Sequence, residues 1–366
     1  MKITCCIDHL GPGGAQRQIS LLANLLVQRD HKVTLLTYHD NSHFASQLHN
    51  RVEVRSIQTN TWIERMLRFR SFLRKSKSDV VITFLRTPSL LAELAAWPNP
   101  PFKLIVSERN LYPNEFFLWR KLRLFLHRLA NAVVTNSPIV LEQLIKEAPA
   151  LAGKSSCIKN GVDLEEFEAA PLKETETITL LFLGKYRFQK NPQLLVEAAA
   201  SFLADHPKEK IKIHFYGENY FDNGAPTALS ATYFDTQRLI DLCGLGDTIK
   251  LHGPSSDVTF LLQNATALVL PSRYEGMANV LCEALACGCP PIVSSEAIND
   301  GLIRDGENGY IFTSNSAEDL KRTISRLVDS TAKQREQMRL EARKSAEEHL
   351  AADKYVEAYL KLMKEL

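Results

Sequence analysis

Short apolar runs rich in β-branched residues alternate with longer helical stretches along nearly the whole 366-residue chain. Such runs are typical of strands buried on both faces, as in parallel sheets that are covered by helices. The series occurs twice, at 3–8, 33–38, 80–85, 104–107 and 132–136, and again at 178–184, 211–217, 249–251, 267–270 and 291–294. The pattern predicts an α/β fold with two parallel-sheet domains.

The domain boundary is expected at Lys159–Asp163, a turn-forming Lys-Asn-Gly-Val-Asp segment. The acidic stretch that follows, 165–177, has no hydrophobic periodicity. We therefore predict domains at 1–165 and 166–349, each long enough to bury its own core. Apolar residues at helical spacing in 350–366 predict a C-terminal helix.

Charge is unevenly distributed over these domains. Residues 1–165 contain 22 Lys and Arg against 13 Asp and Glu, a net +9, whereas 166–366 contain 22 against 29, a net −7. The N-terminal domain is thus suited to an anionic surface. The sequence shows no signal peptide and no apolar run of the ~20 residues that span a membrane, which predicts a cytoplasmic protein.

Seven cysteines, an odd number, lie mostly in apolar contexts, as small buried residues do: Cys5, Cys6, Cys157, Cys243 and Cys282. The remaining pair, Cys287-Gly-Cys289, has no second Cys or His pair at zinc-site spacing. We expect no structural zinc.

The segment Pro271–Pro290 contains the strongest functional signal. Two carboxylates, Glu275 and Glu283, stand eight positions apart, the first after a predicted strand and the second on the following helix. Gly276 and other small residues lie where that helix should begin, so its N–H groups can approach an anion closely. The segment predicts a phosphate site, with Glu283 within reach of a ribose hydroxyl.

This E-x7-E segment resembles the signature of glycosyltransferase family 4, and the resemblance covers nearly the whole chain, most clearly from 178 to 310. The family has the GT-B fold, in which two Rossmann-like domains face a central cleft and the C-terminal helix crosses back to the N-terminal domain. A helix that simply caps the end of the chain is the alternative for 350–366. The resemblance implies that the N-terminal domain binds the acceptor and the C-terminal domain binds a nucleotide sugar.

The resemblance also assigns roles within the segment. Glu275 would contact the transferred sugar or its developing oxocarbenium ion, and Glu283 would hold the ribose hydroxyls. The other implied donor-binding residues are Arg273, Asn279 and the phosphate-binding backbone of Gly276, Met277 and Ala278. The alternative is an ordinary strand and amphipathic helix with a solvated Glu283.

Three cations follow the strand that ends at Gly184: Lys185, Arg187 and Lys190. The β-phosphate that leaves a glycosyl donor gains negative charge in the transition state, so fixed cations there lower the barrier. The family usually has Arg directly after the glycine, whereas this chain has Lys185. Either Lys185 or Arg187 would therefore contact the diphosphate together with Lys190, and a solvated turn is the alternative.

Other donor residues are implied by resemblance alone. Gly217 and Glu218 match a family position near the nucleobase. The glycine loop after the first strand contains Gly13 and Gly14, assigned to the donor, and Gln16, assigned to the acceptor. The loop is not G-x-G-x-x-G, so it does not indicate an NAD site, and a tight turn is the alternative.

Many relatives have a catalytic-site His at the end of the strand where this chain has Glu108 and Arg109. We assign Arg109 to the catalytic site, and Glu108 and Arg86 to the acceptor, with a surface ion pair as the alternative for Arg109. The segment Ser294–Gly301 also departs from the family pattern, which could alter sugar specificity or be a neutral length variant.

Two N-terminal stretches, 62–75 and 116–126, combine aromatic or aliphatic side chains with Lys and Arg. This combination is typical of a helix in an anionic membrane interface, and it is clearer in the first stretch. Helix packing on a sheet is the alternative. Nothing in the sequence favours nucleic acid as a partner.

The sequence thus predicts a cytoplasmic, peripheral membrane glycosyltransferase that moves a sugar from a nucleotide sugar, expected to be a UDP-sugar, to a lipid-linked or cell-surface saccharide. Retention of configuration is implied by the resemblance. The absence of Asp-x-Asp predicts independence from a metal cofactor. A nucleotide-sugar epimerase or hydrolase and a non-catalytic binding subunit are the alternatives.

Overall fold

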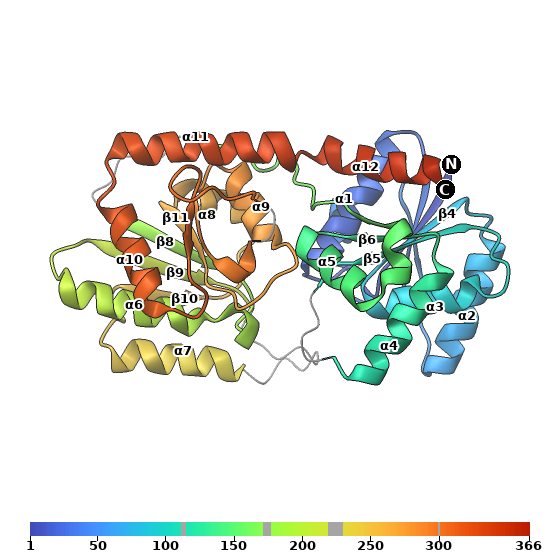
Figure 1. Ribbon diagram of the computed structural model, residues 1–366, viewed down its shortest axis with the longest axis horizontal. Coiled ribbons are helices and arrows are strands. Elements are labelled where there is room, and N and C mark those ends of the chain that lie inside the picture. Colours follow the sequence, from blue (N-terminus) through green and yellow to red (C-terminus); the bar gives the residue numbers. More distant parts are fainter. Residues whose placement is uncertain (111–114, 171–176, 219–229, 299–300) are drawn as a thin grey trace. The chain divides into compact units, whose positions relative to one another are not determined.

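The computed structural model describes residues 1–110, 115–170, 177–218, 230–298 and 301–366. Part of the acidic stretch, 171–176, and residues 299–300 of the segment that departs from the family pattern lie outside these ranges. The chain forms two compact units. The N-terminal unit consists of Met1–Gly161 together with Ala352–Leu366, and the second unit consists of Val162–Ala351. Each is an α/β unit with one sheet (Figure 1).

The N-terminal unit contains a seven-stranded sheet with the order β3-β2-β1-β4-β5-β6-β7. Its strands are all parallel: β1 (Lys2–Cys6), β2 (Lys32–Thr37), β3 (Glu53–Ser56), β4 (Val80–Phe84), β5 (Lys103–Glu108), β6 (Ala132–Thr135) and β7 (Ser155–Cys157). The strand order reverses between β1 and β4. In sheets of this kind ligands bind at the carboxyl ends of the strands on either side of such a reversal.

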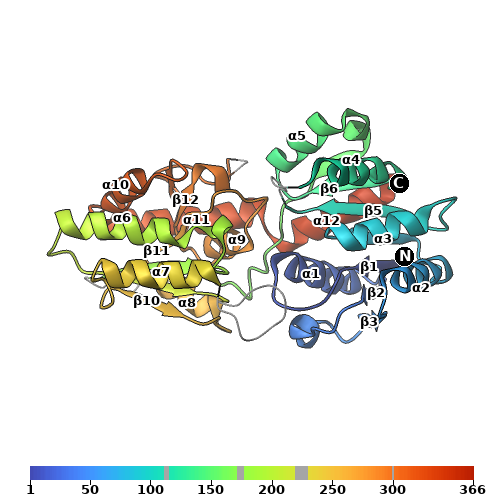
Figure 2. The ribbon, with the colours of Figure 1, turned by 90° about the horizontal axis from the view of Figure 1, so that it is seen from below.

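Helices cover both faces of this sheet (Figure 2). They are α1 (Gly14–Gln28), α2 (Trp62–Lys75), α3 (Arg86–Ala96), α4 (Phe117–Leu126), α5 (Pro138–Glu147) and α12 (Ala352–Glu365), with the 3-10 turns η1 (His43–Gln47), η2 (His127–Leu129) and η3 (Pro149–Lys154). One core joins α1 and α12 to the sheet, and a second joins α2 and α3 to it.

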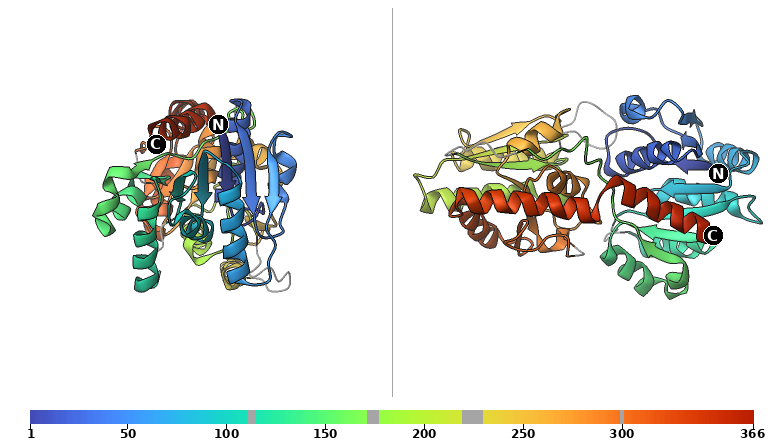
Figure 3. Two further views of the ribbon diagram at one scale, coloured as in Figure 1. Left: turned by 90° about the vertical axis from the view of Figure 1, so that its right-hand side faces the viewer. Right: turned by 90° about the horizontal axis from the view of Figure 1, so that it is seen from above.

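The C-terminal helix belongs to the N-terminal unit, as the family resemblance implied (Figure 3). Helix α12 packs on α1 through its apolar stripe, which includes the fully buried Val356 and Tyr359. The Tyr355 hydroxyl donates to the Gln18 carbonyl oxygen (3.3 Å). A Cβ on Gly161 would lie 2.8 Å from the Tyr355 side chain, so glycine is required where the chain leaves this unit. The alternative of a helix that simply caps the end of the chain is wrong.

The second unit contains a six-stranded parallel sheet with the order β10-β9-β8-β11-β12-β13. Its strands are β8 (Ile178–Leu183), β9 (Ile211–Tyr216), β10 (Ile249–His252), β11 (Ala267–Leu270), β12 (Pro291–Ser294) and β13 (Tyr310–Phe312). Here the order reverses between β8 and β11. The predicted arrangement of two parallel sheets with interleaved helices is confirmed.

Two cores stabilise the second unit, one on each face of its sheet. The helices are α6 (Pro192–Asp205), α7 (Ala231–Leu242), α8 (Val258–Asn264), α9 (Asn279–Ala286), α10 (Ala317–Val328) and α11 (Ala332–His349), with the turns η4 (Phe188–Lys190) and η5 (Ser295–Ala297). Helices α6, α7 and α10 contribute to one core, and α8 and α9 to the other, where α9 contacts α11.

All seven cysteines are free thiols. Five are buried, including Cys287 and Cys289, whereas Cys157 is half-buried and Cys243 is exposed. The expectation that Cys243 is a buried apolar residue is therefore wrong, because it caps the C-terminal end of α7, where the helix meets solvent.

Candidate active site

The candidate site lies in the second unit, where the carboxyl ends of β8 and β11 meet. The chain leaves β8 at Gly184 and forms the turn η4, and it leaves β11 at Pro271 and runs to α9. Because β8 and β11 flank the reversal of strand order, their following loops are neighbours. The predicted cations and the E-x7-E segment therefore occupy one edge of one sheet.

Lys190 and Glu275, both predicted from the sequence, form an ion pair with 2.7 Å between Nζ and Oε1. Glu275 is only 7 % exposed. The Gln189 amide nitrogen donates to the Tyr274 carbonyl oxygen (2.9 Å), and the Arg273 N–H donates to the Gln189 carbonyl oxygen (2.8 Å). These bonds hold the two loops together and fix the Glu275 carboxylate beside the ammonium group.

Asn191 ends the η4 turn in the left-handed region, with φ of 50°. Asn is one of the few non-glycine residues that adopt this conformation readily. Pro192 then begins α6, which its fixed φ favours. The turn thus reverses the chain directly after Lys190 and sets the direction of that side chain.

The Arg273 guanidinium lies over the Phe188 ring, 4.2 Å from the ring centroid. It donates to the Asn191 side-chain oxygen (3.0 Å) and to that of Asn315 (2.5 Å). All these partners are neutral, and within the described part of the chain Arg273 forms no ion pair. Its positive charge is therefore not compensated by a carboxylate at the site.

Lys185 pairs with Glu218 at 2.7 Å, and both side chains are about one-third exposed. Gly217, which precedes Glu218, is required there because a Cβ would lie 1.8 Å from the Gly184 carbonyl oxygen. The Gly184 N–H also donates to the Tyr216 carbonyl oxygen (3.0 Å). The structure thus brings together these four predicted residues, while Arg187 is exposed nearby.

Helix α9 begins at Asn279, with Ala278 as its N-cap. Ala278 is buried and its side chain provides no capping hydrogen bond. Glu283 lies in the second turn and is 6 % exposed, so it is not the solvated residue of the alternative interpretation. Directly after β11, the fully buried Ser272 hydroxyl has no hydrogen-bond partner among the residues that the structure describes. Gly276 and Met277 connect this segment to the start of the helix.

The glycine loop of the N-terminal unit forms a tight start to α1. Gly13 is the N-cap, and a Cβ there would lie 2.1 Å from the Gln16 side-chain oxygen. The Gln16 amide nitrogen in turn donates to Asp8 (3.0 Å), two residues after β1 ends. Gly14 is the first helical residue. A tight turn therefore exists here, and the donor and acceptor roles of this loop stay predictions.

Arg109 is 4 % exposed, so the surface ion pair considered from the sequence is wrong. Its guanidinium lies over the Phe84 ring, 4.3 Å from the centroid. It donates to the side-chain oxygens of Asn160 and Ser107. Its contribution to the catalytic site stays a prediction.

Glu108 belongs to a buried charge network that the sequence did not indicate. His127 is fully buried, with Nδ1 2.5 Å from Glu93 and Nε2 2.8 Å from Glu108. Burial alone lowers the pKa of His127, but hydrogen bonds and charges from the two carboxylates outweigh it and raise that pKa to about 9. Burial likewise raises the pKa of Glu108, but His127 and Arg123 lower it to about 2.

The same network anchors α4. Arg123 pairs with Glu108 at 2.7 Å and with Glu115 at 2.7 Å, and Arg86 pairs with Glu115 at 3.1 Å. These contacts give Glu108 and Arg86 structural partners, and acceptor binding by them stays a prediction. Long-range networks of this kind have no signature in local periodicity, which explains why the sequence did not indicate it.

Comparisons with known proteins agree with this geometry. The family model for "Glycosyl transferases group 1" matches residues 163–345, and that for "Glycosyltransferase Family 4" matches residues 12–166. The chain belongs to glycosyltransferase family 4. It is a glycosyltransferase, as the sequence predicted.

A relative in Campylobacter jejuni is 28 % identical over 85 % of this chain and 84 % of its own length. Its name is "GalNAc-alpha-(1->4)-GalNAc-alpha-(1->3)-diNAcBac-PP-undecaprenol alpha-1,4-N-acetyl-D-galactosaminyltransferase". A D-inositol 3-phosphate glycosyltransferase of Thermobifida fusca is 26 % identical over 55 % of this chain and 48 % of its own length, so it matches about half of each protein.

Solved structures share the fold over the full chain. A Rickettsia africae glycosyltransferase superposes with a TM-score of 0.82 at 18 % identity, covering 100 % of this chain and 98 % of its own. Anabaena HepE, solved with UDP and glucose, superposes with a TM-score of 0.84 at 17 % identity, covering 100 % of both chains. These similarities establish the fold, and the roles of individual residues stay predictions.

Proposed function

We propose that this glycosyltransferase moves a sugar from a nucleoside diphosphate sugar, a UDP-sugar in the first instance, to a lipid-linked or cell-surface saccharide in polysaccharide or lipopolysaccharide assembly. The observation that carries the proposal is the Lys190–Glu275 pair at the reversal of strand order, beside the start of α9. UDP in the HepE structure and the PP-undecaprenol group in the name of the C. jejuni enzyme support this choice of donor and acceptor.

The cations at the site suit the chemistry of a leaving diphosphate. Lys190 has three N–H donors and Glu275 accepts from one of them, so others can bond phosphate oxygens. Arg273 adds a charge whose partners in the described part of the chain are all neutral. These groups stabilise the negative charge that develops on the β-phosphate, which is the task that Mg²⁺ performs in other transferases. We therefore propose a metal-independent reaction.

Glu275 is held in place by Lys190 and can contact hydroxyls of the transferred sugar or the developing oxocarbenium ion. Glu283 is suited to bonding the ribose hydroxyls from α9. In the reaction the bond between the anomeric carbon and the β-phosphate oxygen breaks, and the acceptor oxygen bonds to that carbon from the same face. The acceptor proton passes to the leaving phosphate. Such same-face attack retains the anomeric configuration.

We also propose that the N-terminal unit docks on an anionic membrane surface, where a lipid-linked acceptor would be found. Helix α4 and its preceding residue expose six large apolar side chains, each between 43 % and 63 % exposed: Phe116, Phe117, Leu118, Trp119, Leu122 and Phe125. Lys121 lies over the Phe117 ring (4.3 Å) and Arg128 over the Phe125 ring (5.5 Å). No helix within the described ranges is both long and apolar enough to span a bilayer.

Helix α2 exposes a smaller apolar set, namely Trp62, Ile63 and Leu67. The sequence favoured this stretch over 116–126. The structure instead places the larger apolar surface on α4, because the core takes up Phe69 and Leu73 of α2. Exposed rings with neighbouring cations are the composition expected of an interfacial helix.

Calorimetry with UDP, GDP and ADP, with and without EDTA, tests the donor site. The proposal predicts that one nucleoside diphosphate binds selectively and that EDTA does not change this binding. Binding should be lost in Lys190→Ala and in Glu283→Ala, and kept in the surface control Lys333→Ala. Absence of nucleotide binding in the wild type would refute it. Product NMR with a lipid-linked acceptor then reads the anomeric configuration and separates transfer from donor hydrolysis or epimerisation.

A further inference from the structure

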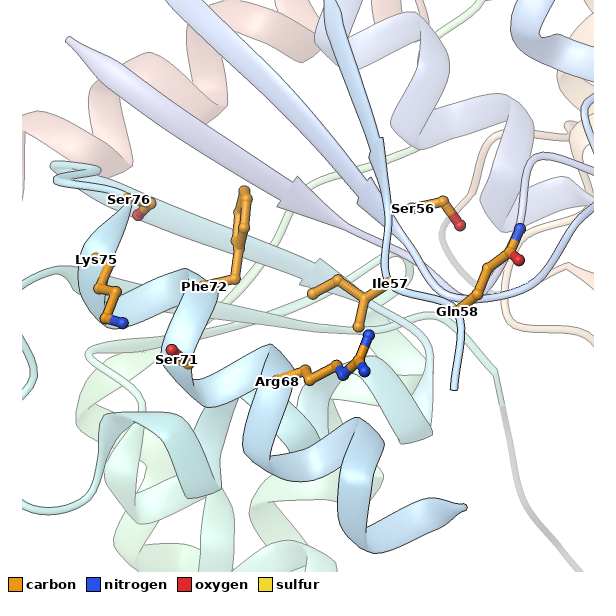
Figure 4. Close-up of a pocket in the computed structure, with 8 residues that line it drawn as sticks. All are labelled: Ser56, Ile57, Gln58, Arg68, Ser71, Phe72, Lys75 and Ser76. Carbon is orange, nitrogen blue, oxygen red and sulfur yellow. The ribbon is translucent and has the colours of Figure 1, made fainter. Parts of the chain in front are cut away.

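We propose that a hollow between the end of β3 and helix α2 binds the phosphate headgroup of an anionic membrane lipid. This inference rests on the membrane docking proposed above and names the lipid chemistry that the N-terminal unit recognises. The hollow has a volume of about 480 Å³ and lies within that unit (Figure 4). Its lining includes Ser56 and Ile57 from the end of β3, and Arg68, Ser71, Phe72 and Lys75 from α2.

The cations of the hollow are available to a ligand. Arg68 and Lys75 are seven residues apart, two helical turns, so they line one side of α2. Lys75 has no hydrogen-bond or ion-pair partner in the described part of the chain. Arg68 pairs with Glu64 at 2.7 Å, but the pair lies at the surface, with the Arg68 side chain 61 % and the Glu64 side chain 37 % exposed, and such pairs contribute little stability and exchange readily.

The other cations of α2 are used by the fold. Arg70 donates to the carbonyl oxygens of Leu94 (2.6 Å) and Trp97 (2.5 Å), at the C-terminal end of α3. Arg74 donates to carbonyl oxygens in the same region, and Arg65 lies over the Tyr38 ring. The fold therefore accounts for three cations of α2. The other two line the hollow: Lys75, and Arg68 with its surface pair to Glu64.

The remaining lining matches a phosphodiester that continues into a glycerol backbone. The hydroxyls of Ser56 and Ser71 have no hydrogen-bond partner within the described ranges, so they can donate to phosphate oxygens beside the two cations. Ile57 and Phe72 supply an apolar wall. Charge-assisted hydrogen bonds to an oxyanion next to apolar surface fit a lipid headgroup at the boundary between water and acyl chains.

Exposed apolar residues of the same helix support a lipid source for this phosphate. Ile63 is 65 % exposed and Leu67 is 56 % exposed. Inserted apolar side chains would bring Arg68 and Lys75 to the level of the headgroups, where cations are attracted to anionic lipids. The net charge of +9 over residues 1–165 adds to this attraction.

The test is sedimentation of the full chain with phosphatidylcholine vesicles that contain or lack phosphatidylglycerol. The measured quantity is the ratio of affinities for the two vesicles. The variant Arg68→Gln/Lys75→Gln removes the cations of the hollow, and Lys32→Gln/Lys103→Gln removes equal charge at exposed strand ends of the same unit. Ser71→Gln fills the hollow without changing the charge or adding apolar surface.

We expect the preference for phosphatidylglycerol to fall about tenfold or more in Arg68→Gln/Lys75→Gln, on the basis of about fivefold for each cation near the surface. It should also fall severalfold in Ser71→Gln, and stay within about twofold of wild type in the control. Equal losses in the two double variants, or wild-type preference in Ser71→Gln, would overturn the headgroup site.

Two further readouts separate this inference from the proposals on which it rests. Wild-type protein that binds neither vesicle would remove membrane docking itself, and with it the headgroup site. UDP binding, measured on every variant, reports whether the donor site of the second unit is intact, and tryptophan fluorescence reports whether the N-terminal unit is folded. A loss of lipid preference with unchanged UDP binding supports a site that is separate from the donor site.

Discussion

The buried imidazole of His127 offers the sharpest test of the electrostatics of the N-terminal unit. We expect His127→Gln to lower the free energy of unfolding of this unit by about 3 kcal/mol near neutral pH. A rise of the pKa from 6.5 to about 9 corresponds to that value at 1.36 kcal/mol per unit. It agrees with the 3–5 kcal/mol typical for removing one partner of a buried ion pair.

The pH dependence has a definite sign. The pKa of His127 is higher in the folded protein than in the unfolded one. Its contribution to the free energy of unfolding is therefore fully present below about pH 6.5 and is lost as the pH rises through 9. Between about pH 6.5 and pH 9, the free energy of unfolding of the wild type should therefore fall by about 3 kcal/mol relative to that of His127→Gln. The variant itself, which lacks the imidazole, should show no such loss.

Urea unfolding followed by tryptophan fluorescence measures this change. All three tryptophans, Trp62, Trp97 and Trp119, lie in the N-terminal unit, so the signal reports that unit alone. His43→Gln is the control, because His43 is exposed and lies in the same unit. A difference below about 1 kcal/mol, the range of an exposed pair, or a difference that does not change with pH, would refute the buried imidazolium.

Three further predictions concern the donor site, the strand ends and the membrane surface. Lys190→Ala should lower kcat by about 100-fold or more, since the loss of one hydrogen-bond donor to a developing oxyanion costs this much. Steady-state kinetics at saturating nucleotide sugar measures kcat, and an unchanged value would contradict the role of Lys190. Gly217→Ala should destabilise the second unit by about 1–3 kcal/mol through overpacking, as thermal unfolding would show, whereas Gly246→Ala, where a Cβ meets no atom within 4 Å, should not. Trp119→Ser should weaken binding to anionic vesicles about tenfold, from the loss of an exposed ring, without changing UDP affinity, and equal vesicle binding would exclude α4 from the interface.

Much of the candidate site was predictable because its residues follow strand ends. The ends of β8 and β11 are visible as the ends of apolar runs, and glycines and small residues mark the loops that come after them. Glu275 and Lys190 were found in this way. The residues that hold this site together were not, since Gln189 bonds the Tyr274 carbonyl oxygen and Asn315 bonds the Arg273 guanidinium through contacts that no spacing rule indicates.

Exposure was the least predictable property. The stretches 62–75 and 116–126 have similar composition, yet α2 buries Phe69 and Leu73 whereas α4 leaves most of its large apolar residues in solvent. Helical periodicity identifies an apolar stripe but does not say which neighbour covers it. Cys243 was misjudged for the same reason.

The sequence by itself determined the two α/β domains, the parallel sheets and the E-x7-E segment, because hydrophobic periodicity and small residues at turns act over a few neighbouring positions. Only the tertiary structure decided the order of the strands, the pairing of Lys190 with Glu275 across 85 residues, and the membership of α12 in the N-terminal unit. It also decided that His127 lies between two carboxylates. Such contacts depend on which elements pack together, and that choice is made by the burial of whole faces rather than by any local pattern.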